Sequence, residues 1–386
     1  MKLLDIHIEN VGGIPNLLLQ NLNPQINIIC GENGVGKTNI LDSVAYMFST
    51  FTTNSITLRK GTTYGKISIN TTNTTLAPLT RILNEYSVRS EQYINNNNEG
   101  IAKQLLSLKV NRVFTYKKEN SIKVDKDPQR QFQRNDAGVD NDDLKNWLVV
   151  RKGFDQINLT DTQRRNSELI TQCFSILNNE YSFSTAKTDF EVYVKTPTSN
   201  DEELHFENLS SGFKSTLFIL LGIIKELDLR FNNIKSADEF DGIILIDEIE
   251  LHLHPQWQGN ICSILKSVFP LAQFFITTHS PHVVQTAQHN EVIALQRIDG
   301  NVIRRELPTS EYGYQGWTIE EILEDVMGMQ DIRSTKFKEI KKLFDDALDA
   351  KNKEQAQLAY AELDKMLHPH YPLRPVFKLQ LDSLGN

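Results

Sequence analysis

The stretch CGENGVGKTN, residues 30–39, contains a complete phosphate-binding pattern, G-x-x-x-x-G-K-[ST]. The apolar run INIIC at 26–30 leads into it, and NILDSVAYMF at 39–48 continues it with helical spacing. Glycines in such a loop let successive backbone N–H groups converge on a phosphate, and the helix N-terminus adds a favourable dipole. The pattern in this strand–loop–helix setting predicts a nucleotide-binding site.

The side chains of this loop predict the ligands as well. In loops of this pattern the lysine reaches the β- and γ-phosphates, and the following hydroxyl ligates Mg²⁺. Here those residues are Lys37 and Thr38, so we expect ATP together with Mg²⁺. The residues expected to surround the phosphates are Asn33, Gly34, Gly36, Lys37, Thr38 and Asn39.

A second motif, GIILIDEIELHLHPQWQ at 242–258, has the form of a buried strand that ends in acids. Four apolar residues are followed by Asp247, which suits Mg²⁺ binding, and Glu248, which suits orienting and deprotonating a water molecule. Apolar strands also end in acids at the surface without any catalytic role. The phosphate-binding loop in the same chain favours the catalytic interpretation.

The polar stretch LSSG at 209–212 runs into TLFILLGIIKEL, which has an apolar helical pattern. By itself it is a helix start, with Ser210 or Ser211 as the cap and Gly212 easing the turn.

Four histidines, His252, His254, His279 and His282, allow a zinc site to be considered. No pattern such as HExxH is present, and the nearby carboxylates are already assigned to Mg²⁺. His279 ends a second apolar strand, FFITT, so we expect its ring to lie beside the same nucleotide rather than on zinc.

After residue 204 the chain alternates between helical and strand patterns, which predicts a wound α/β sheet. Between about 77 and 203 it is rich in Asn and Gln, and after Thr318 it is helical and charged. The helical pieces expected in the middle segment lie at roughly 78–108, 141–152 and 160–178.

The composition is that of an ordinary globular chain, with 39% hydrophobic residues, 23% charged residues and a net charge of −8. Three widely separated cysteines indicate neither a disulfide framework nor a zinc knuckle. No run reaches the length of a membrane span, and the first residues do not resemble a signal peptide, so we expect a cytoplasmic protein without membrane contact.

The motifs GENGVGKTN, LSSG, ILIDEIELHLHP and ITTHSP, in this order, resemble the ATPase head of the ABC class in its SMC, RecF and OLD-related branch. The resemblance implies an α/β fold: an ABC-type P-loop ATPase head with a mostly helical insertion and a C-terminal helical region. The implied domains are a discontinuous ATPase core at 1–76 and 204–300, an insertion at 77–203 and the C-terminal region at 301–386.

The same resemblance implies that two chains sandwich two ATP molecules. Ser210, Ser211 and Gly212 would close over the γ-phosphate held by another subunit. Asp247 and Glu248 match the Mg²⁺ acid and the catalytic base, and His279 matches the switch histidine that senses the γ-phosphate.

Three features depart from the family pattern. Phe213 stands where many members have Gln or Glu, and Gly12 and Gly13 stand where relatives often present an arginine or aromatic residue to the nucleotide. For the glutamine-bearing loop that senses Mg²⁺, Gln92 and Gln104 are only candidates.

The stretch WTIEEILEDVMGM at 317–329, with the charged helices after it, resembles small defence-associated ATPases of the PtuA type, in Septu and retron-associated systems. In such systems the ATPase is paired with an HNH-type nuclease. The insertion lacks long heptads, so we expect no coiled-coil arms of the SMC kind. No acidic cluster resembling a Toprim nuclease follows His279, so we expect no nuclease centre in the chain itself.

The window 103–134 carries nine Lys or Arg against three acids, a net charge of +6. It is either a solvated surface or a phosphate-contacting surface for nucleic acid, since aromatic residues are interleaved with the cations.

The sequence therefore predicts an ATPase that forms ATP-sandwich oligomers, hydrolyses ATP slowly and regulates a separate nuclease in anti-phage defence. Two alternatives stay open: a RecF-like repair ATPase that binds DNA itself, and a scaffold whose nucleotide is structural.

Overall fold

A computed structural model describes residues 1–50, 56–73, 78–85, 99–110, 121, 135, 143–154, 159–186, 190–196, 203–231, 234–308, 310–329 and 333–385. It divides into two compact units, Met1–Gly328 and Met329–Asn386. Gln92 and most of the basic window 103–134 lie outside the described residues.

The first unit is built around a six-stranded sheet in the order β13-β12-β3-β11-β10-β6. Five of its strands run parallel, and β13 pairs antiparallel with β12 at one edge. These strands are β3 (Ile26–Gly31), β6 (Leu105–Leu108), β10 (Ile243–Ile246), β11 (Gln273–Thr277), β12 (Val292–Ile298) and β13 (Asn301–Arg304).

Two antiparallel sheets accompany the central one. The first has the order β2-β1-β4-β5, and the second has the order β7-β8-β9. Their strands are β1 (Leu3–Val11), β2 (Ile14–Leu19), β4 (Tyr64–Thr71), β5 (Leu79–Asn84), β7 (Ser182–Ala186), β8 (Val192–Lys195) and β9 (Glu203–His205).

The helices of the first unit are α1 (Lys37–Phe48), α3 (Glu99–Ala102), α5 (Leu144–Val149), α6 (Asp161–Leu177), α7 (Ser211–Arg230), α8 (Pro255–Val268), α9 (Pro281–Gln285) and α10 (Ile319–Glu321). Single π-helical turns follow α5 and α10, and short 3₁₀ turns precede α7 and β10.

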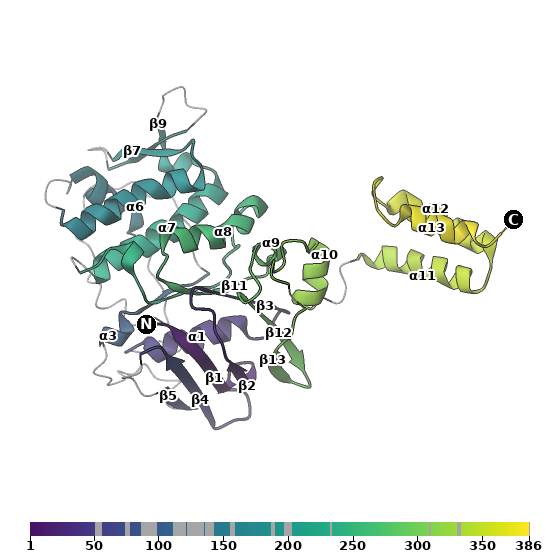
Figure 1. The fold of residues 1–386 in the computed structure, drawn as a ribbon, viewed down its shortest axis with the longest axis horizontal. Coiled ribbons are helices and arrows are strands. Elements are labelled where there is room, and N and C mark those ends of the chain that lie inside the picture. Colours follow the sequence, from purple (N-terminus) through teal and green to yellow (C-terminus); the bar gives the residue numbers. More distant parts are fainter. Residues whose placement is uncertain are drawn as a thin grey trace. The chain divides into compact units, whose positions relative to one another are not determined.

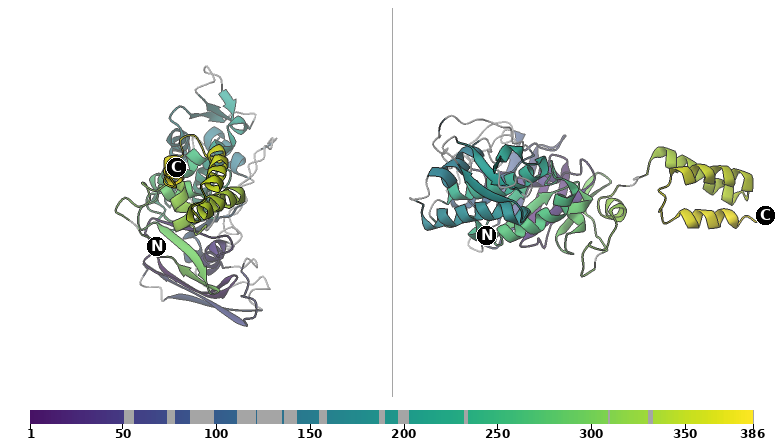
Figure 2. Two further views of the ribbon diagram at one scale, coloured as in Figure 1. Left: turned by 90° about the vertical axis from the view of Figure 1, so that its right-hand side faces the viewer. Right: turned by 90° about the horizontal axis from the view of Figure 1, so that it is seen from above.

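The central sheet separates two hydrophobic cores (Figure 1). Because side chains alternate along a strand, Ile244 and Ile246 of β10 face one core while Ile243 and Leu245 face the other. The first core includes α5 to α9, and the second includes α1 and the four-stranded sheet. The left view of Figure 2 shows the same layers from the side, with the teal helices and the purple sheet at opposite ends.

The structure confirms the predicted α/β class, and it changes the expected picture of the middle segment. The region 78–108, expected to be helical, contributes β5 to the four-stranded sheet and β6 to the central sheet. The run Leu105–Leu108 is fully buried between the two cores and pairs with β10, which explains why an apolar stretch of this length forms a strand.

The expected boundary at residue 301 also differs from the observed division. Tyr314, Ile322, Val326 and Met327 belong to the first core, so the first unit extends to Gly328. The second unit consists of α11 (Thr335–Asp349), α12 (Lys353–Met366) and α13 (Arg374–Asp382) around a small core of its own.

Asp228, near the end of α7, ties the middle segment to the core of the first unit. Its carboxylate is 1% exposed and accepts hydrogen bonds from Trp147 Nε1 at 3.1 Å, Arg151 Nε at 2.8 Å and Asn166 Nδ2 at 2.9 Å. These donors come from α5, the turn after it and α6. One buried acid thus fixes three segments against α7.

We expect Asp228→Ala to lower the free energy of unfolding by about 3–5 kcal/mol, because it removes the buried carboxylate that accepts from the Arg151 cation and from two polar groups. Chemical denaturation measures this change. The matched control is Glu168→Ala, since Glu168 forms an exposed pair with Arg165 at 3.8 Å and is expected to contribute less than about 1 kcal/mol. Equal effects of the two substitutions would contradict the assignment.

Candidate functional site

The phosphate-binding loop joins β3 to α1 at the carboxyl edge of the central sheet. Gly31 has φ +136°, and a Cβ on it would lie 2.2 Å from the carbonyl oxygen of Leu295 on the neighbouring β12. Gly36 caps α1 with φ +112° and has no side chain that could accept from the first N–H groups of the helix. The N-terminus of α1 therefore presents its dipole and backbone donors to an anion.

The Lys37 side chain forms hydrogen bonds with the backbone of this loop. Its ammonium donates to the carbonyl oxygens of Gly31 at 2.9 Å and Glu32 at 3.0 Å, and the residue is 6% exposed. Burial lowers the pKa of Lys37, and Cys30 and the three nearby glutamate and aspartate side chains only partly oppose this. A bound anion would stabilise this ammonium, which fits a phosphate ligand.

Thr38 and Asp247 come together from distant parts of the chain. The Thr38 hydroxyl lies 3.2 Å from both carboxylate oxygens of Asp247. Thr277 donates to Asp247 Oδ1 at 2.5 Å from the end of β11. A hydroxyl and a carboxylate side by side supply the oxygen ligands that Mg²⁺ prefers, so the predicted pair fits this ion.

Glu248 is held by its backbone. Its φ is +47°, in the left-handed region that a residue with a side chain rarely adopts. Its N–H donates to Thr277 Oγ1 at 2.8 Å, so the same threonine that contacts Asp247 also fixes Glu248.

His279 follows β11 at the same edge and is exposed. Burial of part of its ring lowers the pKa of His279, and the ammonium of Lys37 lowers it further, whereas Glu250, Glu248 and Asp247 oppose the shift. These charges belong to the loop and to the acids after β10. The structure thus places His279 among the predicted site residues.

The Ser-Gly loop lies at the start of α7, where Ser210 caps the helix by accepting from the N–H of Phe213 at 3.4 Å. Ser210 and Ser211 are exposed. Gly212 packs against the start of α8, since a Cβ there would lie 3.4 Å from His254 N and Trp257 Cδ1. Within the described residues, no hydrogen bond joins this loop to the phosphate-binding loop.

Phe213, a departure from the family pattern, is a core residue in the structure. Its ring stacks on Tyr181 with centroids 4.5 Å apart and meets Trp257 edge-on at 5.8 Å. It therefore holds the start of α7 in place by packing.

The second departure is at Gly12 and Gly13. Arg297, from β12, donates to the carbonyl oxygens of Gly13 at 3.1 Å and Gly34 at 3.3 Å, and Arg59 donates to Gly13 at 3.3 Å. Two arginines from other segments thus lie at this turn. Neither was expected from the sequence, because neither falls in a motif.

Two further candidates, His254 and Gln104, have backbone contacts of their own. His254 caps α8 by accepting from the N–H of Gln256 at 3.4 Å. Gln104 precedes β6 and lies at the amino end of the parallel strands, opposite the site, where its carbonyl accepts from Ile243.

Among the described residues, one cluster has the spacing of metal ligands, and it consists of Glu191, His205 and Glu207. None of the four histidines considered for zinc belongs to it. The Lys145 ammonium already bridges Glu191 at 2.5 Å and Glu207 at 2.6 Å. The Lys145 ammonium therefore already supplies a positive charge to both glutamates of this cluster.

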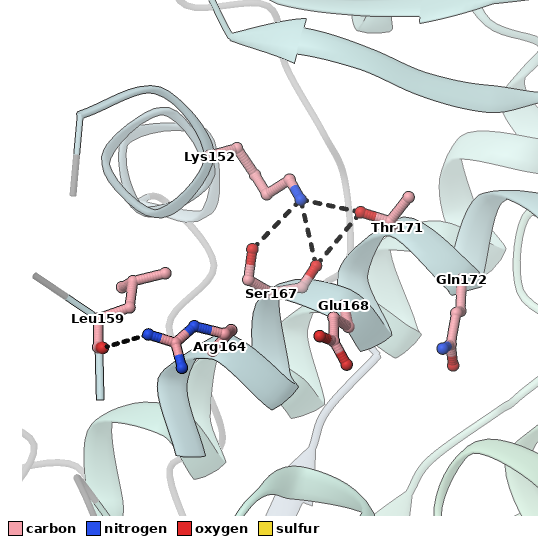
Figure 3. A pocket seen from close by; sticks show the side chains of 7 residues that line it. All are labelled: Lys152, Leu159, Arg164, Ser167, Glu168, Thr171 and Gln172. Carbon is pink, nitrogen blue, oxygen red and sulfur yellow. Dashed lines mark hydrogen bonds between the residues drawn. The ribbon is translucent and has the colours of Figure 1, made fainter. Parts of the chain in front are cut away.

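A pocket of about 460 Å³ lies on the middle segment and contains none of the predicted site residues (Figure 3). Lys152 points toward α6 and donates to Ser167 O and Oγ at 3.2 Å each and to Thr171 Oγ1 at 2.8 Å. The residues that line this pocket are Lys152, Leu159, Arg164, Ser167, Glu168, Thr171 and Gln172.

Comparison with known proteins matches residues 107–285 to a family described as AAA domain, putative AbiEii toxin, Type IV TA system. The SMC head domain from Thermotoga maritima aligns with a TM-score of 0.46 at 14% identity, covering 80% of this chain and 100% of that one. Among the described residues, no helix is long and apolar enough to cross a membrane.

The retron Ec83 probable ATPase of Escherichia coli is 24% identical over 84% of this chain and 76% of its own length. The Septu protein PtuA of Bacillus thuringiensis is 42% identical over 99% of this chain and 98% of its own. The chain therefore belongs to the PtuA family of Septu proteins.

Proposed function

We propose that this protein binds ATP and Mg²⁺ between two of its own copies, hydrolyses ATP slowly and regulates a partner nuclease in anti-phage defence. The observation that carries the proposal is that the predicted site residues lie in two separate groups within one chain. Lys37, Asp247, Glu248 and His279 gather at one edge of the sheet, while the exposed Ser-Gly loop is bonded elsewhere in the same chain.

In this proposal the N-terminus of α1 and Lys37 bind the phosphates, and the ammonium regains the anionic partner that burial makes favourable. Thr38 and Asp247 hold Mg²⁺, which, when bound, neutralises charge on the phosphate oxygens. Thr277 keeps the Asp247 carboxylate oriented through its 2.5 Å hydrogen bond.

Glu248 would orient a water molecule and take its proton. Its backbone is fixed by the hydrogen bond to Thr277, which supports this role by limiting where the carboxylate can lie. His279, on the adjacent strand end, would contact the γ-phosphate. The Ser210 and Ser211 hydroxyls, with the N-terminus of α7, would complete the site of the second copy.

We expect Glu248→Gln to lower ATP turnover at least about 100-fold while ATP binding persists, because the amide keeps the shape but cannot accept the proton. The ATP-bound dimer should then accumulate, and light scattering after size exclusion with ATP and Mg²⁺ measures it. Lys37→Ala is the control, since it should bind no nucleotide and form no ATP-dependent dimer. A Glu248→Gln variant that turns over ATP normally would overturn the base assignment.

We expect Ser211→Arg to abolish turnover without abolishing ATP binding, because the arginine blocks the contact with the other copy's nucleotide. Mixing it with Lys37→Ala should restore turnover to at most about half of the wild-type value, since a mixed dimer has one intact site out of two. A steady-state ATPase assay of the mixture decides this. If no activity returns, the two half-sites do not belong to different chains.

The partner is tested by purifying a tagged copy from its native genomic context. We expect a nuclease subunit in constant ratio to the ATPase, with DNA cleavage by the complex and none by the ATPase alone. Mass spectrometry and a cleavage assay of the eluate measure both. A chain that purifies without a nuclease and whose turnover is stimulated by bare DNA would instead be a repair ATPase.

A further inference from the structure

Glu250, three residues after Asp247, links the two strand ends that carry the site. Its Oε2 accepts from the Thr278 hydroxyl at 2.7 Å, and its Oε1 accepts from the N–H of His279 at 2.6 Å. Both oxygens of one carboxylate therefore bind consecutive residues of the segment after β11. Hydrogen bonds to a charged acceptor are stronger than neutral ones, so this contact is a firm one.

The contact continues beyond Glu250. Thr278 Oγ1 accepts from the N–H of Ser280 at 3.0 Å, and Ser280 Oγ donates to Gln258 at 2.6 Å. Gln258 in turn donates to the carbonyl of Leu253 at 2.8 Å, at the end of the same turn that contains Glu250. The backbone around His279 is thus held from both sides, while the residue itself is exposed.

We propose that Glu250 is a positioning residue that fixes the backbone of His279, and thereby the direction of its imidazole, relative to Asp247 and Glu248. The inference deepens the proposed ATPase function, on which it rests. Two consecutive threonines have separate roles in this arrangement. Thr277 fixes the two acids after β10, whereas Thr278 joins Glu250 to the histidine segment.

The bonding pattern favours positioning over direct proton transfer by Glu250. Its two oxygens already face donors on the protein, whereas a general base must turn toward a water molecule. Its charge also opposes the fall in the pKa of His279 that burial and Lys37 produce. The same charge also partly opposes the lowered pKa of Lys37, so the hydrogen bonds rather than the charge single out His279.

The first test is hydrogen exchange of the nucleotide-free protein, which requires no ATP turnover. In Glu250→Ala the peptide covering 278–282 should exchange about tenfold faster, because the His279 amide loses its acceptor. In Glu250→Gln it should stay protected, since the amide oxygen can still accept. The peptide of α8 (255–268) and the melting temperature report whether the variant is folded. Unchanged exchange at 278–282 in a folded Glu250→Ala protein overturns the proposal.

The second test is steady-state ATPase kinetics of the full chain. Glu250→Ala should lower kcat about 10–100-fold and leave KM for ATP within about twofold, whereas Glu250→Gln should recover most of kcat. The double variant Glu250→Ala/His279→Ala should be no slower than His279→Ala, because both changes remove one function. Glu320→Gln, on an exposed glutamate, is the charge-matched control.

The outcomes distinguish a failure of the positioning role of Glu250 from a failure of the proposed ATPase function. Multiplied losses in the double variant, or a Glu250→Gln protein as slow as Glu250→Ala despite protected exchange, would show that Glu250 acts independently of His279. A wild-type chain that hydrolyses no ATP, with or without its partner, would refute the proposed function. The exchange result would still decide whether Glu250 holds the His279 backbone.

Discussion

Strand β11 lies between β3 and β10, and the site depends on this order. All three strands are parallel, so the phosphate-binding loop, the two acids and His279 emerge at one edge of the sheet. The last residue of β11, Thr277, bonds Asp247 and the N–H of Glu248. Any slip in the register of β11 would separate these groups, because a one-residue shift turns Thr277 to the other face.

Burial gives the site its electrostatic character. The β3, β10 and β11 strands are buried along their whole length, so the polar groups at their ends meet at the edge of an apolar interior. Lys37 is confined there with a lowered pKa, and the acids after β10 partly compensate its charge. In the proposed function the loop would therefore need little reorganisation to bind an anion.

Local sequence patterns were sufficient to predict which residues gather at the candidate site. The phosphate-binding loop, the acids after β10 and His279 were predicted because strand, turn and helix signals surround them, and in the structure they lie at one edge of the central sheet. The strand at Leu105–Leu108 was missed because a short apolar run does not distinguish a strand from a helix. Its pairing with β10 is a tertiary contact between residues far apart in the chain.

The same limit explains the other residues that were missed. Glu250 lies close to Asp247 and Glu248 in the sequence, but its role follows from the two atoms that it meets after β11, which no spacing predicts. Arg59 and Arg297 reach the Gly12–Gly13 turn from separate segments, so the absence of an arginine in that turn does not mean the absence of a cation there.

Helix α7 connects the Ser-Gly loop to the middle region of the chain. Its first residues carry the exposed Ser-Gly loop, and near its end Asp228 is bonded to three segments of the middle region. A 20-residue helix is about 30 Å long, so one continuous helix joins the Ser-Gly loop to Asp228 across that distance. Phe213 fixes the start of the helix by packing between Tyr181 and Trp257. The middle region therefore cannot shift against the core without moving the helix that carries Ser210 and Ser211.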